Sequence, residues 1–269
     1  MPPLAPHEDK TGQPNKNRRA RAVLLGTGPS VPSLDQQNTA LALIGETHTV
    51  LIDCGPPIYL QLLRAGINVS QVDSVVLTHF HPDHVDGLPA LVMAMWIARR
   101  REPLHVYAGA DTAERTAALL GLHRVAEWPG RFPLHAHTIG DEAGAEVLRS
   151  DDFVITSAPT AHYVPSIGLR VVNRRSGAAL AYSGDTAPCD AVLALAQGAD
   201  LLLHESTGPS AGHSSASQAG EIAQKAHVRR LALVHYDAQQ TPPEALVTEA
   251  RRTFDGDIHA GRDLDVFSW

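Results

Sequence analysis

A cluster of ionisable side chains follows the apolar run VDSVVLT at residues 72–78. In the segment LTHFHPDHVDGL these side chains are His79, His81, Asp83, His84 and Asp86. Each would cost several kcal/mol if it were buried without a partner, whereas imidazole and carboxylate groups are ligands that zinc uses in proteins. A regular helix cannot direct residues 79, 81, 83 and 84 to one point. Pro82 favours a turn after a strand, from which these residues could surround two points.

Three further candidate ligands each follow a later apolar run. They are His162 after FVITSAPTA, Asp185 at the end of ALAYSGD, and His235 at the end of RLALVH. Loops at strand ends are where α/β proteins usually build their sites, so the seven residues together could hold two metal ions that share Asp185. The chain has 15 histidines, so a single one after a strand is weak support. We expect ordinary surface or core roles for His48, His105, His123, His135, His137, His227 and His259.

The elements that must position these residues alternate along the chain from residue 21. Short apolar runs typical of strands lie at residues 21–26, 39–45, 48–55, 74–79, 104–109, 145–150, 153–159, 167–172, 178–185, 200–205, 230–236 and 264–269. Helical patterns lie at residues 57–66, 88–101, 188–200, 215–228 and 242–254. Several strands are continuously apolar, as in sheets covered on both faces. Two groups of strands with helices outside predict one four-layer α/β domain over residues 21–269.

Composition narrows the class of protein. The net charge of −7 is unlike that of a typical nucleic-acid-binding protein, and Cys54 and Cys189 are too few for a disulfide scaffold. No apolar run approaches the length of a membrane span. Residues 1–20 are polar and predict a disordered leader. The run AVLL after Arg18 and Arg19 is too short for a signal peptide, which favours a cytoplasmic protein.

These motifs resemble those of the metallo-β-lactamase superfamily. THFHPDH is similar to its T-H-x-H-x-D-H motif, and His162, Asp185 and His235 fall in the order of its later metal-binding motifs. Three further stretches resemble the ribonuclease Z-like branch: LLGTGPSVPS, YSGDTAPCDAVLALAQGADLLLHEST and HSSASQAGEIAQKAHVRRLALVHY. The resemblance extends from about residue 22 to the end of the sequence.

The resemblance implies an αββα sandwich with its site at one edge. It implies two divalent metal ions, with zinc as the default and manganese or iron as alternatives. One ion would be held by His79, His81 and His162, the other by Asp83, His84 and His235, with Asp185 bridging them. A metal-bound hydroxide would be the nucleophile, and Asp83 would orient or deprotonate it.

Two further residues match catalytic positions of the branch. His213, which opens HSSAS, matches a histidine near the leaving group, and Glu205 matches a carboxylate beside it. A protonated His213 could donate to a departing alkoxide. The alternative for His213 is an exposed position next to a helix cap at Ser214.

Two departures from that branch bear on the substrate. Ribonuclease Z of the common bacterial type has a long tRNA-binding arm between the positions that match His162 and Asp185, whereas these residues are 23 positions apart here. Two strands and the turn NRRSG fill this interval. The loop LGTGPSVPS also continues as LDQQN, where the branch often has an arginine before the asparagine. Together with the acidic net charge, these departures argue against tRNA cleavage.

We therefore predict a dinuclear hydrolase that acts on a small ester: a phosphodiester, a sulfate ester or a lactone. A tRNA 3′-end endoribonuclease and a β-lactamase are alternatives, and a metal-binding relative without activity is the weakest alternative because all seven ligands are present. We expect a small-molecule partner, no membrane partner and no nucleic acid, and a homodimer is an open alternative. Trp96 and Trp128 could wall the substrate pocket, with core packing as the alternative. The run Arg99–Arg101 could meet an anionic substrate, with a solvated helix end as the alternative.

Overall fold

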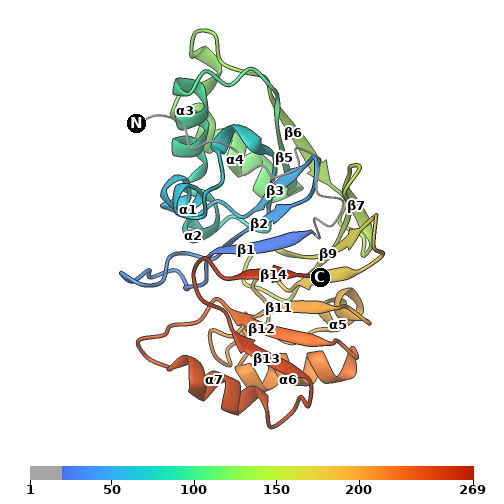
Figure 1. The fold of residues 1–269 in the computed structure, drawn as a ribbon. Helices are drawn as coiled ribbons and strands as arrows, with labels where there is room; N and C mark the ends of the chain where they lie inside the picture. The colour runs from blue at the N-terminus through green and yellow to red at the C-terminus, as the bar shows by residue number, and fades with distance from the viewer. Residues whose placement is uncertain (1–19) are drawn as a thin grey trace, which may run out of the picture.

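Two seven-stranded sheets face each other in the computed structural model, which describes residues 20–269 (Figure 1). The first sheet comprises β1 (Arg21–Gly26), β2 (Ala40–Ile44), β3 (Thr49–Ile52), β4 (Val72–Leu77), β5 (Leu104–Gly109), β6 (Leu134–Ile139) and β14 (Val266–Ser268). The second comprises β7 (Ala145–Arg149), β8 (Phe153–Pro159), β9 (Ile167–Asn173), β10 (Ala179–Tyr182), β11 (Leu201–Glu205), β12 (Arg230–Val234) and β13 (Asp257–Ala260). The disordered leader predicted for residues 1–20 lies outside the described residues except for Ala20.

The two sheets share one pairing scheme. The order β14-β1-β2-β3-β4-β5-β6 has three antiparallel pairs followed by three parallel pairs. The order β7-β8-β9-β10-β11-β12-β13 repeats this pattern. Parallel neighbours end at the same edge of a sheet. The loops that follow β10, β11 and β12 can therefore meet at one edge of the second sheet, and the loop that follows β4 of the first sheet can meet them where the two sheets face each other.

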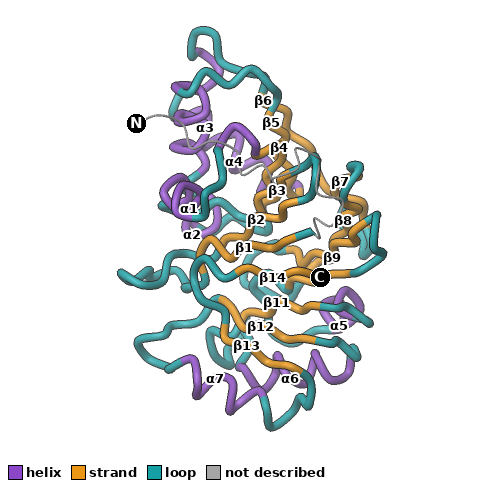
Figure 2. Tube along the Cα trace, in the orientation of Figure 1, coloured by secondary structure: helices purple, strands orange, loops and turns teal. Residues whose placement is uncertain are grey.

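Helices cover the outer face of each sheet (Figure 2). Their bounds are α1 (Ile58–Arg64), α2 (Pro82–Val85), α3 (Leu88–Ile97), α4 (Ala110–Leu122), α5 (Asp190–Ala196), α6 (Ala216–Lys225) and α7 (Pro243–Ala250). Residues of α1 and α3 pack on the first sheet in one apolar cluster, and residues of α5, α6 and α7 pack on the second sheet in another. A third cluster, which includes Leu43, Phe153, Tyr182 and Trp269, fills the space between the sheets. The predicted αββα sandwich is therefore confirmed.

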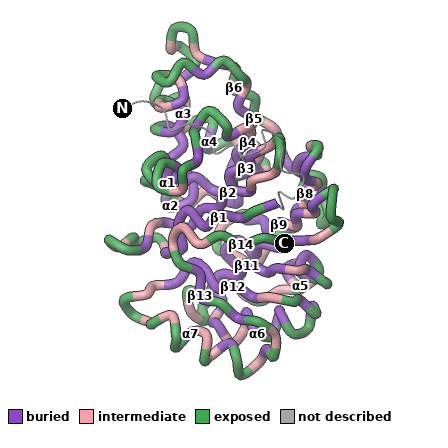
Figure 3. The backbone as a smooth tube through the Cα atoms, viewed as in Figure 1, coloured by how far each residue is buried: buried purple, intermediate pink, exposed green. Residues whose placement is uncertain are grey.

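Burial follows these layers. In Figure 3 the strands are mostly buried, whereas exposed positions gather on helices and loops. Within residues 20–269, no helix combines the length and the apolar character that crossing a bilayer requires. The division into a leader and a single domain over residues 21–269 stays a prediction, although the sheets share one core.

The structure differs from the sequence prediction in four elements. The strands β6 and β13 and the 13-residue helix α4 were not predicted. The helix predicted for residues 88–101 ends at Ile97, before its arginines. Arg100 is buried, and its guanidinium donates to the backbone carbonyls of Ser70, Glu102 and Pro103. These hydrogen bonds tie the segment that follows α3 to the backbone before β4. They give Arg100 a structural role other than that of a solvated helix end.

Candidate metal centre

The seven predicted ligands converge at one edge of the sandwich. They lie on the segments that follow β4, β8, β10 and β12. After β4 the backbone remains extended as far as His81, which caps the single-turn helix α2 that begins at Pro82. The turn predicted from Pro82 is thus a short helix, and it places Asp83 and His84 in that helix beyond the extended histidines.

Three imidazoles form the first group of donor atoms. The Nδ1 atom of His81 lies 3.0 Å from Nε2 of His79 and 3.2 Å from Nε2 of His162. Two zinc ligands with bonds of about 2.0–2.1 Å in a tetrahedral arrangement lie about 3.3 Å apart. The spacing of these nitrogens therefore suits one shared cation.

Asp83, His84 and His235 form the second group. The Oδ2 atom of Asp83 lies 3.4 Å from Nε2 of His84 and 3.5 Å from Nε2 of His235. Asp185 stands between the two groups, because its Oδ2 atom lies 3.6 Å from His84 Nε2, 3.3 Å from His235 Nε2 and 3.9 Å from His79 Nε2. One carboxylate at this position can face two cations, and the bridging role of Asp185 stays a prediction.

Several donor atoms at this site lack a partner. Among the described residues, Nε2 of His84, Nε2 of His235 and Oδ1 of Asp185 are buried without a hydrogen bond. Buried polar atoms in native proteins almost always have a partner. Cations held by these atoms would satisfy them, so the residues present fit the metal ions that the fold implies.

The second ring nitrogen of most candidate ligands is fixed by a neighbour. Nδ1 of His84 bonds to the carboxylate of Asp53 at 2.8 Å. The other pairs are His79 Nδ1 with Thr78 Oγ1 at 3.0 Å, His162 Nδ1 with the carbonyl of Gly212 at 2.8 Å, and His235 Nδ1 with Thr207 Oγ1 at 2.7 Å. Such outer contacts fix the tautomer and turn Nε2 towards a metal ion.

Asp53 and Thr207 were missed by the sequence analysis. Asp53 is buried at the end of β3 and also accepts hydrogen bonds from the backbone and hydroxyl of Thr78. A carboxylate directly after the apolar run TVLI was the available signal. Thr207 had no comparable signal, because its role depends on contact with a histidine 28 residues away.

The pKa values of the clustered imidazoles shift in two directions: burial lowers those of His84 and His235, but the neighbouring Asp185 outweighs it and raises both. Burial lowers the pKa of His79, His81 and His162, which favours the neutral form that binds metals. Burial raises the pKa of Asp83, but the imidazoles of His235 and His84, whose Nε2 atoms lie 3.5 and 3.4 Å from its Oδ2 atom, outweigh it and hold that pKa well below the ordinary range. Asp83 is therefore ionised, which suits a metal ligand and a hydrogen-bond acceptor better than a general base that must hold a proton.

His213 and Glu205 form a pair beside the cluster. The Nδ1 atom of His213 lies 3.0 Å from Oε1 of Glu205. Glu205 is buried at the end of β11 and also accepts backbone N–H groups of Thr186, Thr207 and Ser214. The ring of His213 lies 5.0 Å from that of His162, and its side chain is 17% exposed. Glu205 thus fixes the ring and leaves Nε2 available to a substrate.

The alternative role for Ser214 as a helix cap is wrong. Ser215 caps α6, and it forms a reciprocal capping box with Gln218. The hydroxyl of Ser214 instead donates to the backbone carbonyl of Thr186. Ser214 therefore links the His213 segment to the loop after Asp185.

Close packing fixes the α2 segment against the loop after β3. Cys54 N–H donates to the carbonyl of His84, and Gly87 N–H donates to the carbonyl of Cys54. A Cβ atom on Gly55 would overlap with the carbonyl oxygen of Asp83. Glycine is required there by this approach, which holds Asp83 and His84 in place.

The predicted pocket walls lie elsewhere. Trp96 and Trp128 pack on each other with ring centroids 5.1 Å apart, and Trp96 donates to the carbonyl of Pro129. With Arg99 and Arg101 nearby, Trp96 lines a pocket of about 270 Å³ that includes none of the seven candidate ligands. A different cavity of about 380 Å³ is lined by Thr78, Thr160 and Ser166, next to the His79 segment.

Comparisons with known proteins agree with this geometry. Residues 48–236 match the Beta-lactamase superfamily domain. The chain is 30% identical to ribonuclease Z of Methanothermobacter thermautotrophicus, over 86% of this chain and 91% of the relative. The metallo-beta-lactamase fold protein YhfI of Bacillus subtilis superposes with a TM-score of 0.79 at 21% identity, covering 93% and 99% of the two chains. Human tRNase Z, short form, superposes with a TM-score of 0.77 at 23% identity, covering 92% and 98%.

Proposed function

The chain belongs to the ribonuclease Z-like branch of the metallo-β-lactamase superfamily, a family of metal-dependent hydrolases, and we propose that it is a phosphodiesterase that cleaves the 3′ end of precursor tRNA. The observation that carries the proposal is the pair of donor groups with Asp185 between them. Two cations side by side suit phosphodiester hydrolysis, in which attacking and leaving oxygens both carry developing charge.

Each residue has a distinct part in this proposal. His79, His81 and His162 would hold one ion, and Asp83, His84 and His235 the other, with Asp185 shared. Zinc is the proposed metal, because imidazole and carboxylate donors suit it, and manganese or iron are alternatives. When bound, the two ions would lower the pKa of a water molecule and neutralise charge on the phosphate oxygens.

The chain's own side chains would orient the water and assist the leaving group. Asp83 would accept a hydrogen bond from the attacking water, in keeping with its low pKa. As the new bond to phosphorus forms and the bond to the leaving oxygen breaks, Nε2 of His213 would give that oxygen a proton. Glu205 would keep the imidazole oriented throughout, since it is buried and bonded to Nδ1.

The comparisons support an RNA substrate better than the small ester predicted from the sequence. The curated relative from Methanothermobacter is named ribonuclease Z, and the human structure is a tRNase Z. The acidic net charge remains unusual for an RNA-binding protein. Cytoplasmic location and a homodimer stay predictions of the sequence.

One observation favours a small diester as the second candidate. The alignment with the Methanothermobacter protein extends over 286 positions, whereas 86% of this chain is about 231 residues. About 55 positions of that alignment therefore have no residue of this chain. The 23-residue interval between His162 and Asp185 holds β9 and β10, consistent with the lack of a tRNA-binding arm.

A side-by-side assay would distinguish the two substrates. Metal-loaded protein is given precursor tRNA with a 3′ trailer, bis(p-nitrophenyl) phosphate, and a panel of aryl sulfate, lactone and β-lactam substrates. We expect specific cleavage at the 3′ end of the tRNA, and none by the Asp83→Ala protein. Diester hydrolysis without tRNA cleavage would favour the second candidate, and turnover of neither phosphodiester by metal-loaded protein would refute a phosphodiesterase.

A further inference from the structure

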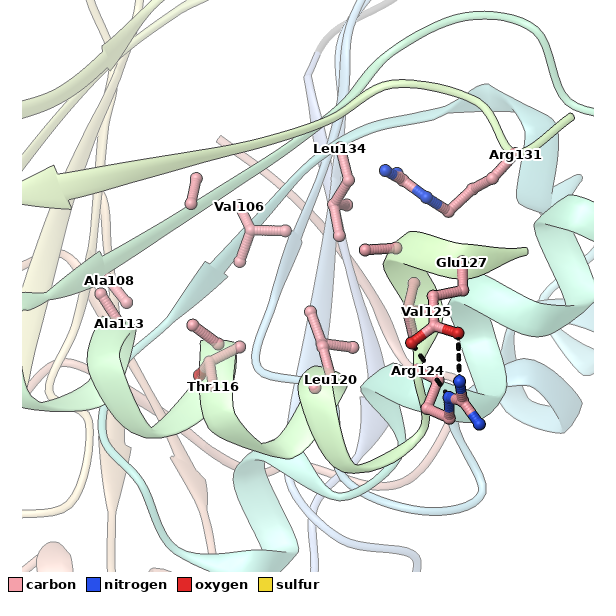
Figure 4. Close-up of a pocket in the computed structure, with 14 residues that line it drawn as sticks. Val106, Ala108, Ala113, Thr116, Leu120, Arg124, Val125, Glu127, Arg131 and Leu134 are labelled. Carbon is pink, nitrogen blue, oxygen red and sulfur yellow. Dashed lines mark hydrogen bonds and ion pairs between the residues drawn. The ribbon is translucent and has the colours of Figure 1, made fainter. Parts of the chain in front are cut away.

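Three histidines lie together on β5 and β6, away from the candidate metal centre. Side chains alternate between the two faces of a strand. Figure 4 shows Val106, Ala108 and Leu134 directed towards α4, where they line a cavity of about 360 Å³. The alternating residues therefore project from the opposite face of the sheet: His105 and Tyr107 from β5, and His135 and His137 from β6.

This opposite face is the inner face of the first sheet at its margin. Tyr107 packs against the core between the two sheets. His105 and His137 are half-buried, whereas His135 is exposed. The cluster is thus open to solvent on one side and supported by packed residues on the other.

Strand register brings the three imidazoles into one group. His105 is paired with His135, and Tyr107 with His137, in the parallel ladder of β5 and β6. His135 and His137, two residues apart, share one face of a strand, and His105 faces both from the neighbouring strand. The ring centroid of His105 lies 5.3 Å from that of His135 and 5.1 Å from that of His137.

One pair of donors in this group, which the structure joins by a hydrogen bond, has the spacing found in the candidate metal centre. Nδ1 of His105 lies 2.9 Å from Nε2 of His137. The corresponding distances among His79, His81 and His162 are 3.0 and 3.2 Å. Two imidazole ligands of one tetrahedral ion lie about 3.3 Å apart. The ligand atoms of all three histidines do not lie within 4.8 Å of one another in this structure, so a shared ion requires the exposed His135 side chain to adopt another rotamer.

The protonation of His105 also suits a cation. Burial lowers the pKa of His105, and the neighbouring His137 and His135 lower it further. Neutral imidazole is the form that binds transition metals. Aromatic packing is the competing explanation, since the ring of Tyr107 stacks on His137 with centroids 4.4 Å apart. Packing with Tyr107 does not account for His135, which is exposed on the solvent side.

We propose that His105, His135 and His137 bind one further transition-metal ion, Zn²⁺, separate from the catalytic site. His105 pairs with Ser74, which precedes His79 by five residues on the same strand. At about 3.3 Å per residue, this separates the two sites by about 16 Å along the strand. Three histidines leave a fourth position of a tetrahedral ion open to water or an external ligand. This site does not depend on the phosphodiesterase proposal.

Zinc stoichiometry tests the proposal. Protein already loaded at the candidate metal centre is dialysed to equilibrium against buffered free Zn²⁺, and bound metal per chain is measured for the wild type and for the His135→Ala and His137→Ala proteins. At a free Zn²⁺ concentration that just fills the additional site, we expect the wild type to bind one more ion than either variant. Loss of one histidine ligand should weaken Zn²⁺ binding at that site at least tenfold. His123→Ala removes an exposed histidine outside the group and should bind like the wild type.

A spectroscopic measurement keeps the test decisive even if one variant folds poorly. Cu²⁺ added to metal-loaded wild type should give an electron paramagnetic resonance spectrum whose nitrogen couplings change in the His135→Ala protein, because that protein keeps only two of the three imidazoles. Hydrolase activity of the His135→Ala protein should stay within a few-fold of the wild type. Equal zinc stoichiometry in all four proteins, or a copper spectrum unchanged by His135→Ala, would overturn the proposal.

Discussion

Replacing Asp53 with asparagine tests whether the contact behind His84 controls the metal centre. One carboxylate oxygen of Asp53 accepts the backbone N–H and the hydroxyl of Thr78, and the other faces Nδ1 of His84 at 2.8 Å. Asparagine has nearly the same shape, and it tolerates the left-handed backbone at this position, where φ is 61°. The substitution therefore changes hydrogen-bonding chemistry while preserving the loop.

The expected magnitude follows from the two ways in which the amide can lie. If its NH₂ group faces His84, Nδ1 must become an acceptor, and the ring proton moves to Nε2, the atom that would bind the metal. If its NH₂ group faces Thr78, a buried backbone N–H loses its acceptor, which costs about 1–3 kcal/mol. Loss of such an outer contact typically lowers metal affinity by about 10–100-fold, equivalent to about 1.4–2.8 kcal/mol. The first orientation lowers metal affinity directly, whereas the second destabilises the Thr78 segment that holds His79.

The assay is competition for metal against chelators of graded affinity, with activity measured on the same samples. Asp73→Asn is the matched control, because Asp73 lies on β4 and accepts a backbone N–H of Thr49 without contact to a candidate ligand. We expect Asp53→Asn to lose metal and activity together, and Asp73→Asn to retain both. Wild-type metal affinity and activity in the Asp53→Asn protein would refute the reasoning.

Three further predictions follow from the same structure. Asp83→Ala should lower kcat by at least about 100-fold, while the melting temperature shifts by only a few degrees because Asp83 lies at the edge of the cluster and not in an apolar core. Near-normal kcat with metal bound would exclude its role. His213→Ala should slow hydrolysis of a diester with an alkoxide leaving group by about 10²–10⁴-fold, but change p-nitrophenyl hydrolysis less than tenfold, because nitrophenolate leaves without a proton; equal losses would contradict proton donation. Asp152→Ala should destabilise the fold by about 2 kcal/mol in urea unfolding, since Asp152 accepts hydrogen bonds from Thr47 and His48 across the sheets. Burial raises the pKa of Asp152, but those N–H groups outweigh it and lower the folded pKa; the wild-type advantage is therefore full above the unfolded value of about 3.9 and is lost as pH falls through the folded pKa. An advantage that does not shrink in acid would contradict this assignment.

The sequence predicted most of this fold because most of its strands are continuous apolar runs. The cluster around His79 could be recognised locally, since several donors lie within six residues. His162, Asp185 and His235 are separated by tens of residues, and the resemblance to known motifs was needed to group them. The structure brings them together because their segments follow strands that end at one edge.

The elements that were missed have weak apolar patterns for identifiable reasons. The buried face of α4 is lined by small side chains such as Thr112 and Thr116, so no stripe of large apolar residues marks it. In β6, histidines occupy the alternate positions that an apolar pattern would fill. Asp53 acts through contacts with His84, 31 residues away, and with Thr78, 25 residues away, and such contacts require the folded chain.

Chemistry and substrate affinity depend on different parts of this fold. The candidate ligands and their partners are mostly buried and bonded to the ends of core strands, so the chemistry depends on residues that the sheets fix. Substrate affinity depends on surface loops, and here the relative aligned over most of this chain has about 55 positions without a counterpart. Lys225 is the one lysine within residues 20–269, so any phosphate contacts with a long RNA would rest on arginines. Each such contact would contribute to a salt-dependent affinity, whereas a small diester needs little beyond the metal centre. An enzyme with this site can therefore retain phosphodiester chemistry while its affinity for RNA differs from that of relatives with the additional segments.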